Sequence, residues 1–194
     1  MTCVCVMIGN DNKSTLDDAA MTQTTNVLIL CTGNSARSIL AEAIFQRACN
    51  GRIRAYSAGS QPRGSPHPAA IALLADLGYD TSRFRSKSWN EFAVAGAPHM
   101  DIVLTVCDSA AGESCPFWPG SPVKAHWGIP DPAGIEGKPL EARAAFELAY
   151  RRLERRIDRF AALPFQALDS KALQEQLNQI GESERHTDGY RRRD

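Results

Sequence analysis

The sequence lacks any long hydrophobic run and any excess of charge of one sign. No apolar stretch approaches the roughly 18 residues that a helix needs to cross a bilayer. Lys and Arg together number 22, and Asp and Glu also number 22, so the chain has no charge excess of the kind that binds nucleic acid or an anionic membrane. We therefore expect neither nucleic acid nor a membrane as a partner.

The start of the chain also lacks the basic region and apolar core of a secretory signal. Residues 1–25 show no sustained helical or strand period and are predicted to form a flexible leader. In the absence of an export signal, we expect the protein to be cytoplasmic. In that reducing compartment its six cysteines are expected to be free, catalytic or metal-bound rather than linked as structural disulfides.

Apolar strand-like runs alternate with helical patterns from residue 26 onward. This alternation predicts one α/β domain over 26–163, built as a four-stranded parallel sheet with helices on both faces. The last predicted helix, over about 140–163, carries an apolar stripe, and its many arginines are expected to face solvent. A polar tail follows over 164–194. Three apolar residues in the tail suggest one short helix: Leu173, Leu177 and Ile180.

Two of the predicted strands end directly at a cysteine. The apolar run 26–30 leads into Cys31, and the run 101–106 leads into Cys107. In parallel sheets of this kind, ligands bind at the carboxyl ends of the strands. The shared placement of Cys31 and Cys107 therefore predicts that the two thiols belong to one site.

The segment that joins the first strand to the first helix has the composition of an anion-binding loop. Gly33 permits a tight turn, and successive backbone N–H groups with the helix N-terminus form a cradle for an anion. Arg37 supplies a planar fork that can hold two oxyanion oxygens. This positive field is expected to lower the pKa of Cys31, with Ser38 placed to donate a hydrogen bond to the thiolate. The predicted oxyanion-binding residues are Thr32, Gly33, Asn34, Ser35, Ala36, Arg37 and Ser38. The alternative is a buried structural cysteine beside an ordinary helix start.

This loop resembles that of the low-molecular-weight protein tyrosine phosphatases and the related arsenate reductases. Two later segments, 56–59 (Tyr-Ser-Ala-Gly) and 127–134 (Trp-Gly-Ile-Pro-Asp-Pro-Ala-Gly), carry the same resemblance. It implies a fold of the phosphotyrosine phosphatase I-like type and assigns Asp131 as the general acid that protonates the leaving oxygen. Without the resemblance, Asp131 and Pro132 would be interpreted as an ordinary turn.

A second pair of thiols bears on the type of reaction. Cys107 and Cys115 flank a stretch of small and polar residues, an arrangement that resembles the thioredoxin-coupled arsenate reductases. This resemblance implies that Cys31 attacks arsenate, that Cys107 attacks the resulting adduct, and that Cys115 resolves the disulfide. The electrons would come from thioredoxin, or from glutaredoxin or a low-molecular-weight thiol, with no tightly bound cofactor. The loop between the two cysteines is one residue longer than in typical reductases of this type.

The main alternative is a phosphatase that hydrolyses aryl phosphates with the same loop. The tyrosines that follow the Asp-Pro pair in phosphatases are replaced by Ala133 and Gly134, which argues against an aromatic wall for a phenyl ring. A non-catalytic oxyanion sensor is a further possibility. Cys107 and Cys115 could also be a core thiol and a loop thiol without a redox role.

The sequence favours no bound metal. A zinc site built from Cys107, Cys115 and His126 would have an unusual spacing and no evident fourth ligand. The residues that bind potassium in some relatives match only in part. Asn34, Glu42 and Ser57 are present, but Lys87 and Ser88 stand where an Asp is expected, so a dependence on potassium is doubtful.

Overall fold

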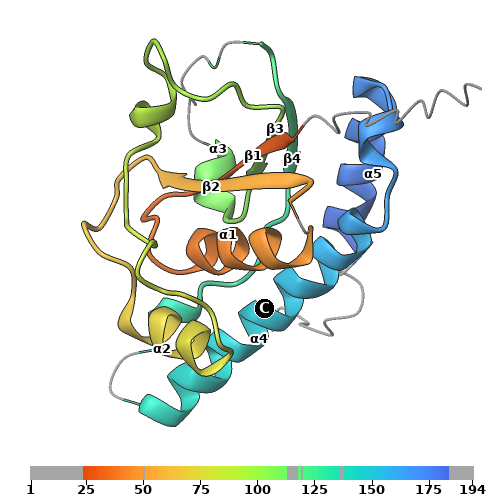
Figure 1. Cartoon of the computed structure of the whole chain (residues 1–194). Coiled ribbons are helices and arrows are strands. Elements are labelled where there is room, and N and C mark those ends of the chain that lie inside the picture. Colours follow the sequence, from red (N-terminus) through yellow and green to blue (C-terminus); the bar gives the residue numbers. More distant parts are fainter. Residues whose placement is uncertain (1–23, 50, 113–117, 119, 136–137, 184–194) are drawn as a thin grey trace, which may run out of the picture.

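A computed structural model describes residues 24–49, 51–112, 118, 120–135 and 138–183 (Figure 1). Most of the predicted leader lies outside the described residues, as does the end of the tail. Cys115 lies outside them too.

The centre of the fold is a sheet of four parallel strands. Their order is β2-β1-β3-β4, so the first strand of the chain lies inside the sheet, between the second and the third. At their carboxyl ends Cys31 is opposite Gly59, and Leu30 is opposite Thr105. The predicted four-stranded parallel sheet is confirmed. The strands are β1 (Thr25–Cys31), β2 (Ile53–Gly59), β3 (Ile102–Thr105) and β4 (Val123–His126).

Five α-helices and three short 3-10 helices surround the sheet in the described residues. The α-helices are α1 (Arg37–Ala48), α2 (Pro68–Asp76), α3 (Asp108–Gly112), α4 (Pro139–Ala161) and α5 (Ser170–Ser183). The 3-10 helices are η1 (Trp89–Phe92), η2 (Pro132–Gly134) and η3 (Phe165–Ala167). Helix α5 lies along β4, beside the end of α4 (Figure 1).

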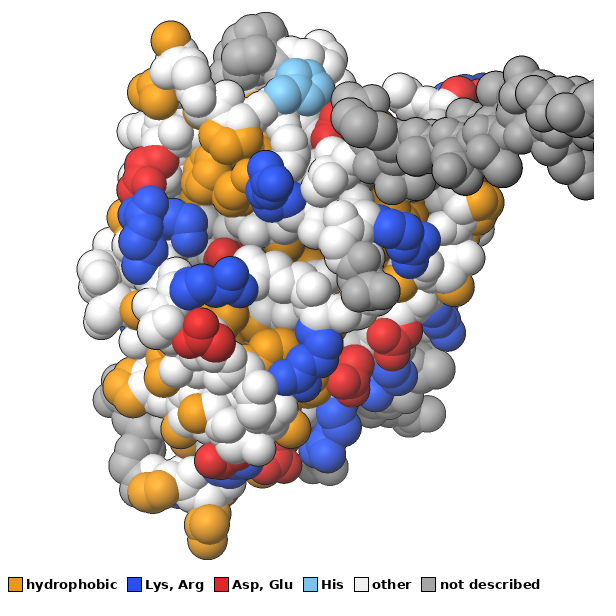
Figure 2. Space-filling model, in the orientation of Figure 1, with side chains coloured by type: hydrophobic (Ala, Val, Ile, Leu, Met, Phe, Trp, Pro, Cys, Tyr) orange, Lys and Arg blue, Asp and Glu red, His pale blue; other side chains and the backbone are white. Residues whose placement is uncertain are grey.

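The molecular surface carries charges of both signs. On the face shown in Figure 2, Lys and Arg side chains lie next to Asp and Glu side chains, without a continuous field of one sign. Arg143, for example, pairs with Asp76 at 2.6 Å and with Glu147 at 2.8 Å. No helix of the described residues is long and apolar enough to span a bilayer.

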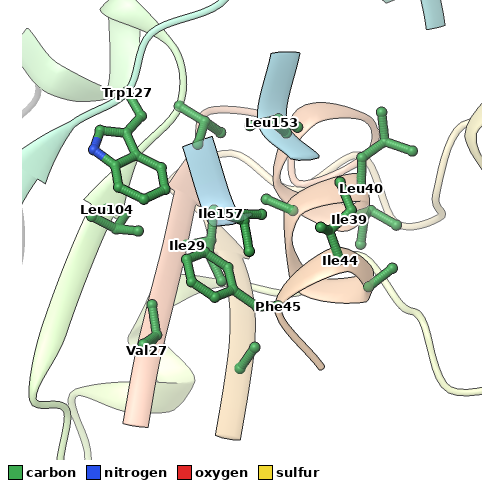
Figure 3. Close-up of a cluster of buried hydrophobic side chains, with 14 of the residues drawn as sticks. Val27, Ile29, Ile39, Leu40, Ile44, Phe45, Leu104, Trp127, Leu153 and Ile157 are labelled. Carbon is green, nitrogen blue, oxygen red and sulfur yellow. The ribbon is translucent and has the colours of Figure 1, made fainter. Parts of the chain in front are cut away.

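Alternate residues of β1 face two separate apolar clusters. Val27 and Ile29 are fully buried among side chains of α1 and α4, including Phe45 and Ile157 (Figure 3). Leu28 and Leu30 point to the other face, where the apolar cover comes from the segment that contains η1, with Met100, Val103 and Trp118. Because β1 is buried on both faces from Val27 onward, residues 27–30 form a continuous apolar run, as expected for a central parallel strand.

One arginine of α4 is buried, which corrects the expectation that the arginines of this helix face solvent. Arg156 is 2% exposed and donates to the carbonyl oxygens of Trp127 at 2.8 Å and Gly128 at 3.3 Å. A third contact reaches the carbonyl of Gly181 in α5. Arg156 therefore connects α4 and α5 to the segment that leads from β4 to Asp131.

Helix α5 approaches the end of β4 very closely. The indole N–H of Trp127 donates to the carbonyl of Leu177 at 2.9 Å. A Cβ atom at Gly181 would lie 2.4 Å from the carbonyl oxygen of His126, so only glycine allows this approach without a shift of the backbone.

Candidate active site

The predicted anion loop lines a cavity of about 240 Å³ at the carboxyl end of β1. Asp131, predicted as the acid, lines the same cavity from a segment some hundred residues later in the chain. The loop residues that face it are Cys31, Thr32, Gly33, Ser35, Ala36 and Arg37. Asn34 and Ser38, also predicted for the loop, are fully buried behind it.

The Cys31 thiol is held by two hydrogen-bonding groups of the loop. The backbone N–H of Asn34 donates to Sγ at 3.2 Å, and Ser38 Oγ lies 3.0 Å from Sγ. The amide nitrogen of Asn34 also donates to Ser38 Oγ at 2.9 Å. Because Ser38 Oγ accepts from that amide, its own proton is free to point at the sulfur. Both contacts therefore favour a thiolate.

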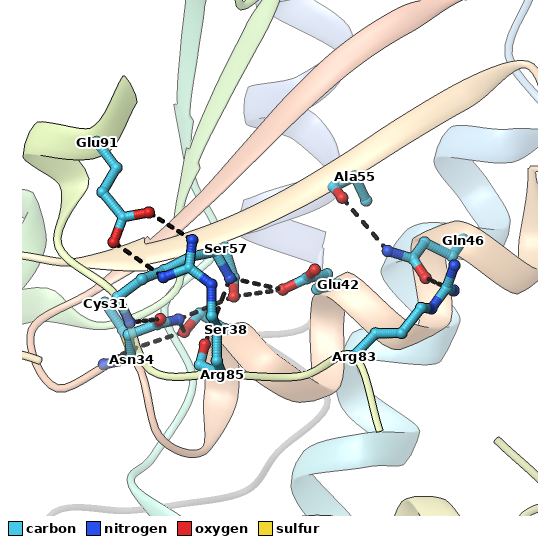
Figure 4. Close-up of polar contacts among 11 residues, drawn as sticks. Cys31, Asn34, Ser38, Glu42, Gln46, Ala55, Ser57, Arg83, Arg85 and Glu91 are labelled. Atoms are coloured by element: carbon cyan, nitrogen blue, oxygen red, sulfur yellow. Dashed lines mark hydrogen bonds and ion pairs between the residues drawn. The ribbon is translucent and has the colours of Figure 1, made fainter. Parts of the chain in front are cut away.

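Asn34 connects the loop to two neighbouring segments through all its side-chain hydrogen-bonding groups (Figure 4). Its Oδ1 accepts from the backbone N–H of Lys87 at 2.8 Å, so Nδ2 must supply the donors. Nδ2 donates to Ser38 Oγ and, at 2.8 Å, to Ser57 Oγ. The backbone of Asn34 has a φ of 40°, in the left-handed region that asparagine tolerates better than most residues. This residue therefore sets the shape of the loop.

Behind Asn34, a buried lysine takes part in the network. Ser57 Oγ donates to Glu42 Oε2 at 2.5 Å, and Lys87 Nζ lies 3.6 Å from the same oxygen. Burial raises the pKa of Glu42, while Lys87 and Ser57 lower it, and burial lowers the pKa of Lys87. The ammonium group thus places a positive charge beside Glu42, among the residues that matched the potassium ligands of relatives.

The pKa of the Cys31 thiol differs from the expectation drawn from the sequence. Burial raises this pKa above its usual value, and the neighbouring Cys107 raises it further. The hydrogen bonds of Ser38 and Asn34 act in the opposite direction and lower it. The expected net lowering is therefore wrong, because burial of the sulfur outweighs the hydrogen bonds of the loop.

Arg37 and Asp131 form an ion pair at the mouth of the cavity. Arg37 Nη2 lies 3.0 Å from Asp131 Oδ2, and Nη1 donates to the carbonyl of Ile129 at 3.2 Å. The other carboxylate oxygen of Asp131 accepts from the N–H of Ala133 at 3.1 Å and caps η2. Asp131 is thus both a turn residue, as the bare sequence suggested, and a group that faces the anion cavity.

A neighbouring loop, which the sequence did not identify as part of the site, completes the cavity. Gln61 and Arg63 line it, and their backbone N–H groups donate to the carbonyls of Thr32 at 2.9 Å and Gly33 at 3.0 Å. At the start of this loop, a Cβ atom on Gly59 would lie 2.4 Å from the carbonyl oxygen of Thr32. No motif could have predicted these contacts, because they depend on the pairing of β1 with β2.

The second predicted thiol lies next to the anion loop. Cys107 Sγ is 3.7 Å from Thr32 Oγ1, and it accepts from the backbone N–H of Ala110 in α3 at 3.4 Å. Cys107 is 2% exposed. The structure thus brings Cys31 and Cys107 together at adjacent strand ends, as their positions in the sequence predicted.

A family model described as low molecular weight phosphotyrosine protein phosphatase matches residues 26–178. The chain belongs to this family. An arsenate reductase of Halalkalibacterium halodurans is 34% identical over 135 residues, which are 70% of this chain and 94% of the relative. The predicted membership is therefore confirmed, and the chain is an enzyme of this phosphatase-like group.

The similar solved structures include proteins named as arsenate reductases and proteins named as tyrosine phosphatases. The arsenate reductase of Archaeoglobus fulgidus is similar with a TM-score of 0.56 and 25% identity, covering 71% of this chain and 99% of that one. A low molecular weight protein tyrosine phosphatase of T. tengcongensis has a TM-score of 0.54 and 26% identity, covering 70% and 96%. The fold is thus common to reductases and phosphatases, and the choice between them depends on the site.

The zinc alternative gains no support from His126. Its Nδ1 is 2.8 Å from Thr105 Oγ1, and its Nε2 is 3.0 Å from Asp108 Oδ1. Cys115, the other proposed ligand besides Cys107, lies outside the described residues. Within the described ranges, no cluster of His, Cys, Asp and Glu side chains is arranged to hold a metal ion.

Cys49 is the remaining thiol within the described residues. It is fully buried in the main apolar core, and burial raises its pKa to about 11. Such a thiol is protonated at neutral pH and inaccessible, so Cys49 is suited to packing rather than to redox chemistry.

Proposed function

We propose that this enzyme reduces arsenate to arsenite, using Cys31 as the nucleophile and Cys107 as the thiol that supplies the second sulfur. The observation that carries the proposal is the position of Cys107, whose sulfur lies 3.7 Å from Thr32 Oγ1 in the anion loop. The 34% identity to an arsenate reductase over nearly all of that protein supports the same substrate.

A phosphatase has no need of the second thiol. Hydrolysis of a phosphate ester requires a nucleophile, an oxyanion-binding group and an acid, which Cys31, Arg37 and Asp131 would provide. It leaves no role for a buried thiol next to the loop. The described residues that line the cavity also include no aromatic side chain that would hold a phenyl ring.

The proposed chemistry starts with the thiolate of Cys31. Loop N–H groups and Arg37 hold the oxyanion, and the sulfur displaces one oxygen to form a sulfur–arsenic bond. Asp131 gives a proton to that leaving oxygen, which departs as water. Before the proton is given, the oxyanion must replace Asp131 as the partner of Arg37. Its binding therefore separates the Asp131 carboxyl group from the guanidinium.

Reduction takes place in the second step. The Cys107 thiolate attacks Cys31 Sγ, a Cys31–Cys107 disulfide forms, and the electron pair of the sulfur–arsenic bond stays on arsenic, which leaves as arsenite. The backbone N–H of Ala110 donates to Cys107 Sγ at 3.4 Å and holds this sulfur beside the anion loop. In the third step Cys115 attacks Cys107, so that the disulfide becomes Cys107–Cys115 and Cys31 is free again.

The oxidised pair must then be reduced from outside. We propose a dithiol protein such as thioredoxin as the donor, with glutaredoxin or a low-molecular-weight thiol as the alternative, in a cytoplasmic setting. Because the Cα atoms of a disulfide lie within about 7 Å of each other, residues 108–114 are expected to rearrange when Cys115 reaches Cys107.

The direct test is arsenate-dependent oxidation of reduced thioredoxin by the purified full-length chain. Cys107→Ser should lose arsenate reduction but keep turnover of an aryl phosphate, which needs no redox thiol. Cys115→Ser should complete one turnover and stop as a Cys31–Cys107 disulfide, identified by mass mapping. Cys49→Ser is the matched control, because it removes a thiol that is remote from the cavity.

Three results would count against the proposal at different levels. No arsenate turnover with any thiol donor would refute the function. Normal cycling of Cys115→Ser with thioredoxin would remove Cys115 from the relay. Normal cycling of both redox variants with glutathione and glutaredoxin would mean that an external thiol attacks the adduct, and the internal relay would be wrong.

A further inference from the structure

Arg63 is a second guanidinium at the anion cavity, and the proposed reaction gives it no role. It lines the cavity together with Arg37 and Asp131 but comes from the loop after β2. Its side chain lies along the anion loop, since a Cβ atom on Gly33 would be 3.3 Å from Arg63 Nε and 3.4 Å from its Cγ. The absence of a side chain at Gly33 therefore leaves the room in which Arg63 lies.

The two arginines of the cavity differ in their partners. Arg37 is engaged by Asp131 at 3.0 Å and by the carbonyl of Ile129. Within the part of the chain that the structure describes, the Arg63 guanidinium has neither an ion pair nor a hydrogen bond. Its backbone is nevertheless fixed, because its N–H donates to the carbonyl of Gly33 at 3.0 Å. Arg63 is thus an exposed cation, held next to the cavity and available to a ligand.

The direction of attack determines which oxygen such a cation would meet. The sulfur of Cys31 lies at the floor of the loop, and displacement in line with it requires the leaving oxygen to point to the mouth of the cavity. In a free oxyanion this outward oxygen bears a hydroxyl group or negative charge. In an aryl ester the same oxygen carries the ring. A guanidinium at the mouth would bind the charged or hydroxyl oxygen of the free oxyanion and gain little from the ester oxygen.

We infer that Arg63 binds the outward oxygen of the substrate and makes the site selective for free inorganic oxyanions over phosphate or arsenate esters. This inference rests on the proposed function for the identity of the substrate, and it adds a residue that determines specificity. Arg63 also offsets the repulsion between an incoming dianion and the carboxylate of Asp131, which lines the same cavity. Its rigid fork is suited to oxygens on a tetrahedral anion.

The test compares two ligands that differ only at the outward oxygen. Inorganic phosphate and phenyl phosphate are titrated calorimetrically into the full-length chain in a Cys31→Ser background, which cannot turn the ester over. Arg63→Ala should raise the dissociation constant of phosphate about tenfold, the effect of losing one charge-assisted hydrogen bond at an exposed position. The constant for phenyl phosphate should stay nearly unchanged, and Arg63→Lys should recover part of the loss for phosphate.

A matched control separates this effect from the overall charge. Arg54→Ala removes one exposed positive charge from β2, away from the residues that line the cavity, and should leave both dissociation constants unchanged. An equal weakening of both ligands by Arg63→Ala would overturn the inference, since Arg63 would then act only through its general field. No weakening of either would overturn it as well.

Arsenate turnover with wild-type Cys31 distinguishes failure of this inference from failure of the proposed function. If the wild-type chain fails to reduce arsenate with every thiol donor, the proposed function falls, whatever the phosphate titrations give. If it does reduce arsenate, Arg63→Ala should raise KM for arsenate and leave kcat within a small factor. An unchanged KM would overturn the inference and leave the proposed function intact.

Discussion

The hydroxyl group of Ser38 offers the sharpest test of how the loop controls its nucleophile. It lies 3.0 Å from Cys31 Sγ and accepts from the Asn34 amide, so its proton is directed at the sulfur. Burial raises the pKa of Cys31, and the Ser38 hydroxyl is the largest of the influences that lower it. Ser38→Ala removes this influence and leaves the burial in place, so the pKa of Cys31 should rise further.

The size of the effect follows from the charge of the acceptor. A hydrogen bond to an ionised group contributes about 1.5–3 kcal/mol. Since one pKa unit corresponds to about 1.4 kcal/mol, the pKa of Cys31 should rise by about one to two units. Neutral pH lies below the pKa of Cys31, so the fraction of Cys31 present as thiolate falls tenfold for each unit by which this pKa rises. Alkylation of Cys31 at neutral pH should therefore slow by about 10-fold to 100-fold.

The assay is the rate of iodoacetamide labelling of Cys31, followed by peptide mass mapping from neutral to alkaline pH. Ser57→Ala is the matched control, because Ser57 contacts the same Asn34 amide at 2.8 Å but not the sulfur. It should shift the pKa of Cys31 much less than Ser38→Ala. If Ser38→Ala leaves the pKa unchanged, or if both variants shift it equally, the direct hydroxyl–sulfur contact does not control the thiol.

Four further outcomes are expected. Cys31→Ser should abolish arsenate reduction and aryl phosphate hydrolysis together, because a hydroxyl in this loop is not ionised at neutral pH; activity near that of the wild type would contradict its role as nucleophile. Asp131→Asn should slow adduct formation about 10²–10⁴-fold in a single turnover, because an amide cannot give a proton to the leaving oxygen. Gly59→Ala should weaken phosphate binding measured by calorimetry, since its Cβ would meet the Thr32 carbonyl at 2.4 Å; an unchanged affinity would show that the loop can shift freely. Turnover should be equal in potassium and sodium chloride of the same ionic strength, because Lys87 already places a cation beside Glu42; selective stimulation by potassium would refute this.

The local parts of this site were predictable from the sequence. Residues 27–30 before Cys31 are all apolar because this part of β1 is buried on both faces. Such a run ending at Cys-Thr-Gly defines the strand and the loop directly. The same pattern before Cys107 placed the second thiol at the adjacent strand end. Strand order then brings the two together, as the rule for ligand sites in parallel sheets anticipates.

The parts that depend on contacts between distant segments were not predictable. The backbone N–H of Lys87 meets Asn34 across 53 residues, and nothing in either local pattern indicates that contact. Arg156 lies three residues after Leu153, on the buried face of α4, although its charge favours solvent. The carbonyls of Trp127 and Gly128 that accept from it belong to a distant segment, which the helix pattern does not indicate. The raised pKa of Cys31 has the same origin, since burial is a property of the assembled fold rather than of the loop.

The attachment of the 61–63 loop to the anion loop has a consequence for how substrate range can change. The two loops are joined through main-chain groups, with the N–H groups of Gln61 and Arg63 donating to carbonyls of Thr32 and Gly33. Main-chain bonds are indifferent to the side chains at those positions. Residues at the mouth can therefore be exchanged while the nucleophile and its cradle keep their geometry. One catalytic loop can then serve a free oxyanion or an ester, according to which side chains its neighbour presents.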